Sequence, residues 1–170
     1  MVFAPLAVAA LLVSACTGSQ SAGSSAGAAR SSAAVAGAGV AGGNGCAGQP
    51  PVSPLPVWAR SGFSPADQAM PHVLGKAGDI VAILWAPRDA LHSPPLQDRN
   101  NKILWVSRVP VVAADPLVIR AALAGSTRTV TVSVPGGPGP SIIDLPAPGC
   151  WTLHLSWSGH TDELQLRYVA

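Results

Sequence analysis

The chain is poor in charge, and its first third has almost none. Only 11% of its 170 residues are charged, with Lys+Arg 10 against Asp+Glu 8. Lys and Arg form no cluster, so the electrostatic footprint of a nucleic-acid-binding protein is missing and we predict no nucleic-acid partner. Residues 1–49 contain one charged residue, Arg30, and one aromatic, Phe3. Such a segment cannot bury enough surface to fold alone, so we place the folded domain at 50–170.

The chain also lacks an apolar run long enough to cross a bilayer as a helix. The run Val2–Val13 covers twelve residues, where a spanning helix needs about 20. Its length fits the hydrophobic region of a secretory signal peptide, and small residues follow it. No Lys or Arg precedes it, which departs from the usual signal pattern and leaves the true start of translation open. We expect residues 1–15 to be a signal peptide.

The small residues at the end of this run form a specific motif. Val13-Ser14-Ala15-Cys16 resembles the lipobox of bacterial lipoproteins. The resemblance implies that the Cys16 thiolate receives a diacylglyceryl group, that cleavage precedes it, and that fatty acyl chains such as palmitate hold the protein on the extracytoplasmic face of the cell membrane. Two acyl chains suffice for stable anchoring. The alternative is an ordinary secretory signal with a chance cysteine.

Residues 16–49 combine this cysteine with a tract dominated by three small residue types. Ala, Gly and Ser fill 25 of the 33 positions from 17 to 49. This composition is typical of a flexible tether. Matches to GxGxxG at 37–42 and to GxSxG at 23–27 arise from that composition, because neither has the strand and helix context that its chemistry requires.

Cysteine is scarce, with three residues in the chain. If Cys16 carries lipid, Cys46 and Cys150 remain, and an oxidising compartment favours a disulfide between them. The alternatives are two free thiols or a soft-metal pair, although the spacing fits no zinc pattern. We predict the disulfide.

The domain reads as short strands between turn residues, with no sustained helical period. Its fold class is therefore predicted as all-β, an antiparallel β-sandwich of about seven strands. A further edge strand is possible at 57–63, and 64–72 reads as a short helical turn or loop. The seven strands are expected at 79–86, 102–109, 116–123, 129–134, 141–145, 150–157 and 163–169.

Alternation assigns the faces of these strands. In 116–123 every second residue from Leu117 points inward, against Val118, Arg120 and Ala122 on the other face. The strand at 79–86 is almost wholly apolar, as expected for burial on both faces. Trp58 is predicted to be exposed. The other four tryptophans are predicted to lie in the core: Trp85, Trp105, Trp151 and Trp157.

The last two strands permit a register prediction. Matching their apolar faces pairs Trp157 with Leu164 and Leu153 with Tyr168, leaving a loop at 158–163. His154 then faces Arg167 on the polar side.

This sandwich resembles an immunoglobulin-like architecture at the level of pattern, without the Cys…Trp…Cys spacing of true immunoglobulin domains. Pro148-Gly149-Cys150-Trp151 and the stretch Lys102-Ile-Leu-Trp105-Val resemble segments of uncharacterised secreted bacterial lipoproteins. That resemblance implies no activity.

Candidate site residues are few. The connection 87–101 is long and polar, and binding residues concentrate on such loops, although a solvated loop without a partner fits as well. We predict binding residues on this connection and at one exposed tryptophan. The residues concerned are Trp58, Arg88, His92 and Arg99.

Catalytic and metal signatures are weak. Met70 and His72 suit copper, but one thioether and one imidazole are too few ligands, and His154 and His160 are spaced too far apart to share a metal. No nucleophile motif stands in a strand-turn context. We therefore expect no enzyme, no cofactor and no metal.

The preferred hypothesis is a lipid-anchored, extracytoplasmic β-sandwich that acts as a non-catalytic binding or interaction module. Its partner would be a cell-envelope protein, a glycan or a small ligand. The alternatives are an envelope copper carrier or enzyme using Met70, His72 and His92, and a passive structural lipoprotein.

Overall fold

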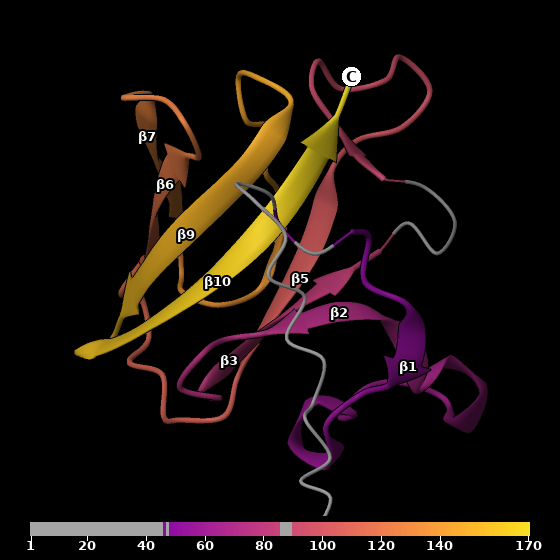
Figure 1. The fold of residues 1–170 in the computed structure, drawn as a ribbon. Coiled ribbons are helices and arrows are strands. Elements are labelled where there is room, and N and C mark those ends of the chain that lie inside the picture. Colours follow the sequence, from indigo (N-terminus) through magenta and orange to yellow (C-terminus); the bar gives the residue numbers. More distant parts are fainter. Residues whose placement is uncertain (1–45, 47, 86–89) are drawn as a thin grey trace, which may run out of the picture. The chain divides into compact units, whose positions relative to one another are not determined.

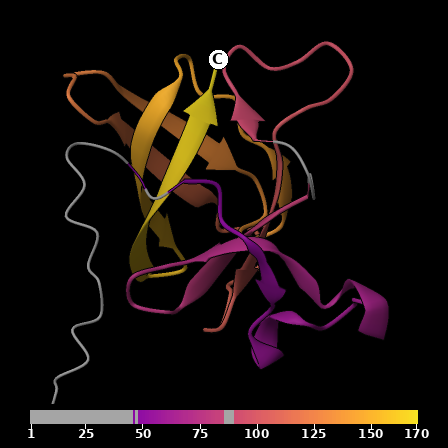
Figure 2. The ribbon, with the colours of Figure 1, turned by 45° about the vertical axis from the view of Figure 1, so that its right-hand side comes forward.

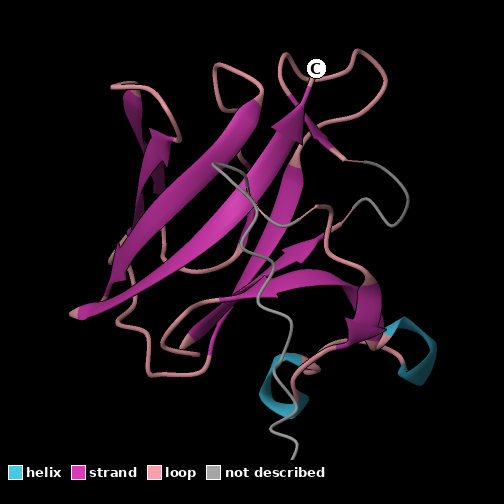
Figure 3. Cartoon of the chain, viewed as in Figure 1, coloured by secondary structure: helices cyan, strands magenta, loops and turns pink. Residues whose placement is uncertain are grey.

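Ten β-strands supply most of the regular structure in residues 46, 48–85 and 90–170, the part of the chain that this computed structural model describes. They form two five-stranded sheets (Figure 1; Figure 3). In order across sheet 1 lie β1 (Val52–Pro54), β2 (Ala69–Leu74), β3 (Ile80–Leu84), β5 (Lys102–Ser107) and β8 (Pro140–Ile142). In order across sheet 2 lie β4 (Leu91–His92), β10 (His160–Val169), β9 (Gly149–Trp157), β6 (Leu117–Leu123) and β7 (Thr129–Val134).

The all-β sandwich predicted from the sequence is confirmed. All seven expected strands are present, and β1, β2 and β4 are additional. The region 57–63 does not form an edge strand but contains the 3-10 helix η1 (Val57–Ala59). The region 64–72 contains a second 3-10 helix, η2 (Pro65–Asp67), and most of β2. The strands β1 and β2 were not predicted because they contain Pro54 and Pro71, and proline is normally confined to the edges of a sheet.

One strand pair departs from the antiparallel arrangement. The two-residue strand β4 pairs with β10 in parallel, with Leu91 opposite Tyr168 and His92 opposite Val169. All other pairs of strands in the described residues are antiparallel. This parallel pair lies only at the edge of sheet 2. Its strand β4 falls within residues 87–101, which were predicted to be a loop.

The main core lies between the sheets and is built by alternation. Leu117, Ile119 and Ala121 of β6 are fully buried, as the face assignment predicted. The strand β9 contributes Trp151, Leu153, Leu155 and Trp157, all 2% exposed or less. The indole N–H groups of Trp151 and Trp157 donate to Ala147 O and to Ser107 Oγ, so these buried rings leave no donor unsatisfied.

Burial of β3 on both faces is also confirmed. Ile80, Ala82 and Leu84 belong to the main core, whereas Val81 and Ile83 form a second cluster with Leu55 and Ala59 on the opposite face of sheet 1. The segment that carries β1 and η1 therefore covers the outer face of β3. The expectation that Trp85 lies in the core is wrong, because its side chain is 43% exposed directly after β3 ends.

The predicted register of the last hairpin is wrong by four residues. Trp157 pairs with His160, and Leu153 pairs with Leu164. The turn contains only Ser158 and Gly159, both with positive φ, as two-residue hairpin turns with the right twist require. A shift by an even number keeps every side chain on its expected face, so the core prediction survives the error.

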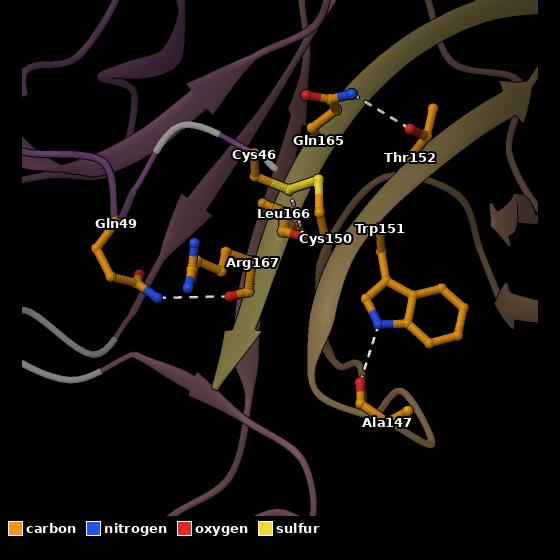
Figure 4. Close-up of a disulfide and its surroundings, with 9 residues drawn as sticks. All are labelled: Cys46, Gln49, Ala147, Cys150, Trp151, Thr152, Gln165, Leu166 and Arg167. Carbon is orange, nitrogen blue, oxygen red and sulfur yellow. Dashed lines mark hydrogen bonds between the residues drawn. A yellow bond between two sulfur atoms is a disulfide. The ribbon is translucent and has the colours of Figure 1, made fainter. Parts of the chain in front are cut away.

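The structure joins Cys46 to Cys150 at the start of β9 (Figure 4). Their Cα atoms are 5.2 Å apart, within the range that a disulfide spans. Gln49 Nε2 donates a hydrogen bond to Arg167 O at 3.4 Å, which adds a second tie between this segment and sheet 2. The beginning of the described chain is thus held against β9 and β10. The predicted signal peptide, the lipidated Cys16 and the tether up to residue 45 lie outside the described residues.

Candidate binding site

The structure does not bring the sequence-predicted binding residues together. Trp58 lies on η1 and packs half-buried against the second cluster, so the prediction of an exposed ring is only partly met. Figures 1 and 2 show the 3-10 helices at one end of the domain and the segment 93–101 at the other. His92 and Arg99 belong to that second end, and Arg88 lies outside the described residues.

The connection that was predicted to frame a recognition surface is held in place by its own side chains. Asn101 accepts a hydrogen bond from His92 N at 2.8 Å and donates to His92 O at 2.9 Å, so its amide acts as a strand partner for β4. Asn101 also donates to Asp144 at 2.7 Å. The Ser93 hydroxyl donates to Leu145 O. These contacts use the His92 backbone rather than its ring, whose Nδ1 is buried and meets no partner in the described residues.

Two further groups in this region have a shifted pKa. A hydrogen bond from Arg99 lowers the pKa of the Asp98 carboxyl, and the two side chains form an exposed ion pair at 3.2 Å. Burial, with the nearby Asp144 charge, raises the pKa of Tyr168 above its usual range. The Tyr168 phenol therefore remains protonated and donates to Ile143 O at 2.6 Å. These interactions fasten the end of β10 and do not create a reactive group.

The residues of the copper alternative are divided between the two sheets. Met70 and His72 lie on β2 of sheet 1, where the His72 ring is 2.9 Å from Met70 O and Met70 packs on the second cluster. His92 lies on β4 at the edge of sheet 2. No three His, Cys, Asp or Glu side chains of the described residues form a group placed to hold a metal ion.

A different surface, the outer face of sheet 2, carries a depression of about 790 Å³. Three polar side chains cross it in register on adjacent strands, since Arg120 of β6 lies opposite His154 of β9, and His154 lies opposite Glu163 of β10. We call these three residues the polar row. The rest of the lining is Lys76, Ala77, Val118, Leu155, Ser156, Thr161 and Asp162.

The wall of the depression that carries Lys76 is fixed by Asp162. The Asp162 carboxylate accepts hydrogen bonds from the amides of Ala77 at 2.8 Å, Asp79 at 3.1 Å and Glu163 at 2.7 Å. In addition, Lys76 N donates to Glu163 O. Because the protein itself occupies the Asp162 oxygens, this acid holds the turn 75–79 against β10 and offers little to a ligand.

The charges that remain available in the depression are mainly positive. His154 Nδ1 lies 3.2 Å from Glu163 Oε2, so the Glu163 carboxylate of the polar row already has a partner in the protein. Arg120 and Lys76 are exposed, and neither charged group meets a hydrogen-bond or ion-pair partner in the described residues. A guanidinium beside the hydroxyls of Ser156 and Thr161 suits a carboxylate or phosphate group, which it binds through two parallel N–H groups.

Only part of this site could be predicted from the sequence. It placed Arg120 on the polar face of its strand, but the wrong register set His154 against Arg167 instead of Glu163. The Ser158-Gly159 pair was the available signal, because a two-residue turn there brings Glu163 opposite His154. Lys76 reaches the site only through the long-range contact of its turn with β10, which no local pattern reveals.

A second exposed group lies beside sheet 1. The Trp85 ring has Phe63 at 6.0 Å between centroids, and the Lys102 ammonium lies 4.8 Å from its centroid. The cation and the neighbouring ring hold this exposed indole in place. It is the largest exposed aromatic side chain in the described residues.

None of the described helices is both long and apolar enough to span a membrane. Comparison of the chain with protein-family models, with curated proteins and with solved structures finds no match. Any functional conclusion therefore follows from the geometry of the described residues and from the motifs of the sequence.

Proposed function

We propose that this chain is a lipid-anchored protein of the extracytoplasmic membrane face, and that its β-sandwich is a non-catalytic module that binds an acidic glycan of the cell envelope in the depression of sheet 2. The proposal takes the compartment from the lipobox-like motif and the ligand chemistry from the polar row. Of the three partner classes considered from the sequence, a cell-envelope protein, a glycan and a small ligand, this proposal chooses the glycan.

One observation carries the choice of ligand. Arg120 stands in the depression of sheet 2, exposed and without a partner among the described residues, and hydroxyl groups line the same depression. An open, strand-built surface with a free guanidinium and hydroxyls fits a chain of sugars that carry carboxylates, because the hydroxyls bind sugar hydroxyls and the guanidinium binds the acid. A neutral apolar ligand would leave Arg120 and Lys76 desolvated and unpaired, at a cost in affinity.

The disulfide supports the compartment. Disulfides persist in oxidising environments outside the cytoplasm, and Cys46 and Cys150 form one in the structure. The pairing also leaves Cys16 as the single remaining thiol of the chain, the residue that the lipobox-like motif assigns to lipid. Both features fit export followed by anchoring.

The first prediction tests the anchor. Cys16→Ser removes the sulfur that would carry the acyl chains, so the full chain is expected to lose its membrane association. The twelve-residue apolar run Val2–Val13 is too short to hold the chain in the membrane as a spanning helix. Membrane fractionation followed by intact mass measurement checks this. Ser14→Ala is the matched control, because it keeps a small residue before the cysteine and should leave the protein on the membrane. Membrane retention of Cys16→Ser at the wild-type level would remove the lipoprotein assignment.

The second prediction tests the binding site. Arg120→Gln is expected to weaken binding of an oligogalacturonide by about tenfold, the effect of losing about 1.4 kcal/mol from a charged contact. Arg167→Gln is the control, because it removes the same charge from the same face of sheet 2 at a position outside the depression. Isothermal titration of both full-length variants, with a neutral malto-oligosaccharide of equal length as reference ligand, measures the difference.

Equal weakening by Arg120→Gln and Arg167→Gln would show that only the overall charge attracts the acid, and would overturn the assignment of the site. Binding of the neutral oligosaccharide as tightly as the acidic one would overturn the ligand class.

A further inference from the structure

The four edges of the two sheets differ in how well they are protected. The edge strands β1, β4 and β8 have three, two and three residues. Prolines stand at or beside each of them: Pro54 ends β1, Pro94 follows soon after β4, and Pro140 begins β8. Short strands and prolines are the devices by which proteins prevent unwanted pairing at an edge.

The fourth edge, β7, is longer than these three and has a proline only after its last residue. It is six residues long and reads Thr-Val-Thr-Val-Ser-Val, with no charge and no proline. It pairs with β6 on one side only, and no strand of the described residues adjoins its other side. Five of its six residues are β-branched, which favours an extended conformation ready to accept a further strand.

The side chains of β7 make it complementary to itself. Val130 and Val132 are partly buried against the margin of the main core, while Thr129, Thr131 and Ser133 are exposed on the other face. Two copies of β7 in antiparallel pairing about a two-fold axis place residues of the same face opposite one another, so valines meet valines and hydroxyls meet hydroxyls. A charged residue in the middle of the strand would meet its own copy there, and β7 contains none.

We propose that β7 is the contact of a symmetric dimer. The β7 edges of two copies pair antiparallel, so that sheet 2 of one copy and sheet 2 of the other form one continuous sheet. The occupant is a second copy because this edge is uncharged and self-complementary, and a two-fold contact between identical strands is an isologous interface. Pro135 follows directly and ends the ladder, because it supplies no N–H donor.

The inference is independent of the glycan and of the anchor. It predicts that Thr131, at the middle of β7 and on its exposed face, lies next to Thr131 or Ser133 of the other copy. Ser156 is the matched reference position, because it is also exposed on the outer face of sheet 2 but lies on the central strand β9, which has neighbours on both sides.

Cross-linking tests the contact in the full chain. Thr131→Cys and Ser156→Cys are each treated with a short bis-maleimide in the membranes of the producing cell, alongside the parent chain, which reports any reaction of the native cysteines. The Thr131→Cys chain is expected to give a homodimer band severalfold stronger than either reference. Equal bands for Thr131→Cys and Ser156→Cys, or an adduct of Thr131→Cys with a different protein in place of the homodimer, would overturn the proposal.

A second variant separates loss of pairing from loss of folding. Thr131→Lys places two like charges across the two-fold axis. Because Thr131 also lies opposite Arg120 of β6, the circular dichroism spectrum checks that the new charge leaves the monomer folded. Sedimentation of the full chain in detergent is expected to show a dimer for the parent and for Ser156→Lys, and a monomer for Thr131→Lys with an unchanged circular dichroism spectrum. A monomeric parent, or a Thr131→Lys chain that remains dimeric, would contradict the assignment.

Discussion

Replacing Cys46 and Cys150 together by alanine is expected to lower the free energy of unfolding by about 3–5 kcal/mol. The two residues are separated by 104 positions, so the bond closes almost the whole domain into one loop of the unfolded chain. In the chain-entropy model a loop of about 100 residues contributes roughly 4.7 kcal/mol. Because domains of this size have a total stability of about 5–15 kcal/mol, this one bond is a large share of it. Urea unfolding followed by tryptophan fluorescence measures the change.

Reduction of the unchanged chain provides the control for this experiment. Dithiothreitol should lower the urea midpoint of the parent chain by most of the shift that the double substitution causes, and should have no effect on the double variant. Cys46 is almost fully buried, and alanine there leaves a small gap, so part of the loss in the variant comes from packing. A double variant that unfolds at the same urea concentration as the oxidised parent would show that the bond does not stabilise the domain.

The faces of most of the predicted strands were readable from the sequence because their inward and outward residues alternate. A buried side chain every second residue, as in Leu117 to Ala121, follows from the two-residue period of a strand and from a core on one side only. The uniform burial of Ile80–Leu84 was likewise readable, because only a strand covered on both faces lacks polar positions. Local periodicity thus determines burial without reference to which strands are neighbours.

The arrangement of strands and the candidate site were less readable, because both depend on contacts between distant residues. The register of the last hairpin depends on a two-residue turn, and every even shift satisfies the same apolar pattern. Trp85 follows an apolar strand, yet it lies beyond the cover that the β1–η1 segment gives to Val81 and Ile83. The polar row required the correct pairing of three strands before Arg120, His154 and Glu163 could be placed together.

A second large loss of stability is expected from Gly75→Ala, by about 2–4 kcal/mol. A Cβ atom at Gly75 would collide with the Asp162 carboxylate, and that side chain is short and held by three backbone amides. To make room, Asp162 must give up hydrogen bonds to a charged group, worth about 1.5–3 kcal/mol each, or the turn must move away from β10. Backbone strain contributes little, because Gly75 does not adopt a left-handed conformation.

Gly78→Ala is the matched control in the same turn. Nothing lies within 4 Å of a Cβ at Gly78, and its φ of +78° costs an alanine about 1 kcal/mol. Thermal and urea unfolding of the two variants should therefore rank Gly75→Ala well below Gly78→Ala. The opposite order would mean that conformational freedom, rather than contact with Asp162, explains the glycine at position 75.

A double-mutant cycle isolates that contact. Asp162→Ala by itself removes the carboxylate that accepts hydrogen bonds from the amides of Ala77 and Asp79 in the turn and of Glu163 in β10, and is expected to be strongly destabilising. In that background the collision at Gly75 no longer exists, so Gly75→Ala should cost nothing further, or stabilise slightly by restricting the unfolded chain. Full additivity of the two losses would contradict the contact between Gly75 and Asp162. Because the same turn carries Lys76 into the depression of sheet 2, both single variants are also expected to weaken oligogalacturonide binding, whereas Gly78→Ala is expected to retain most of it.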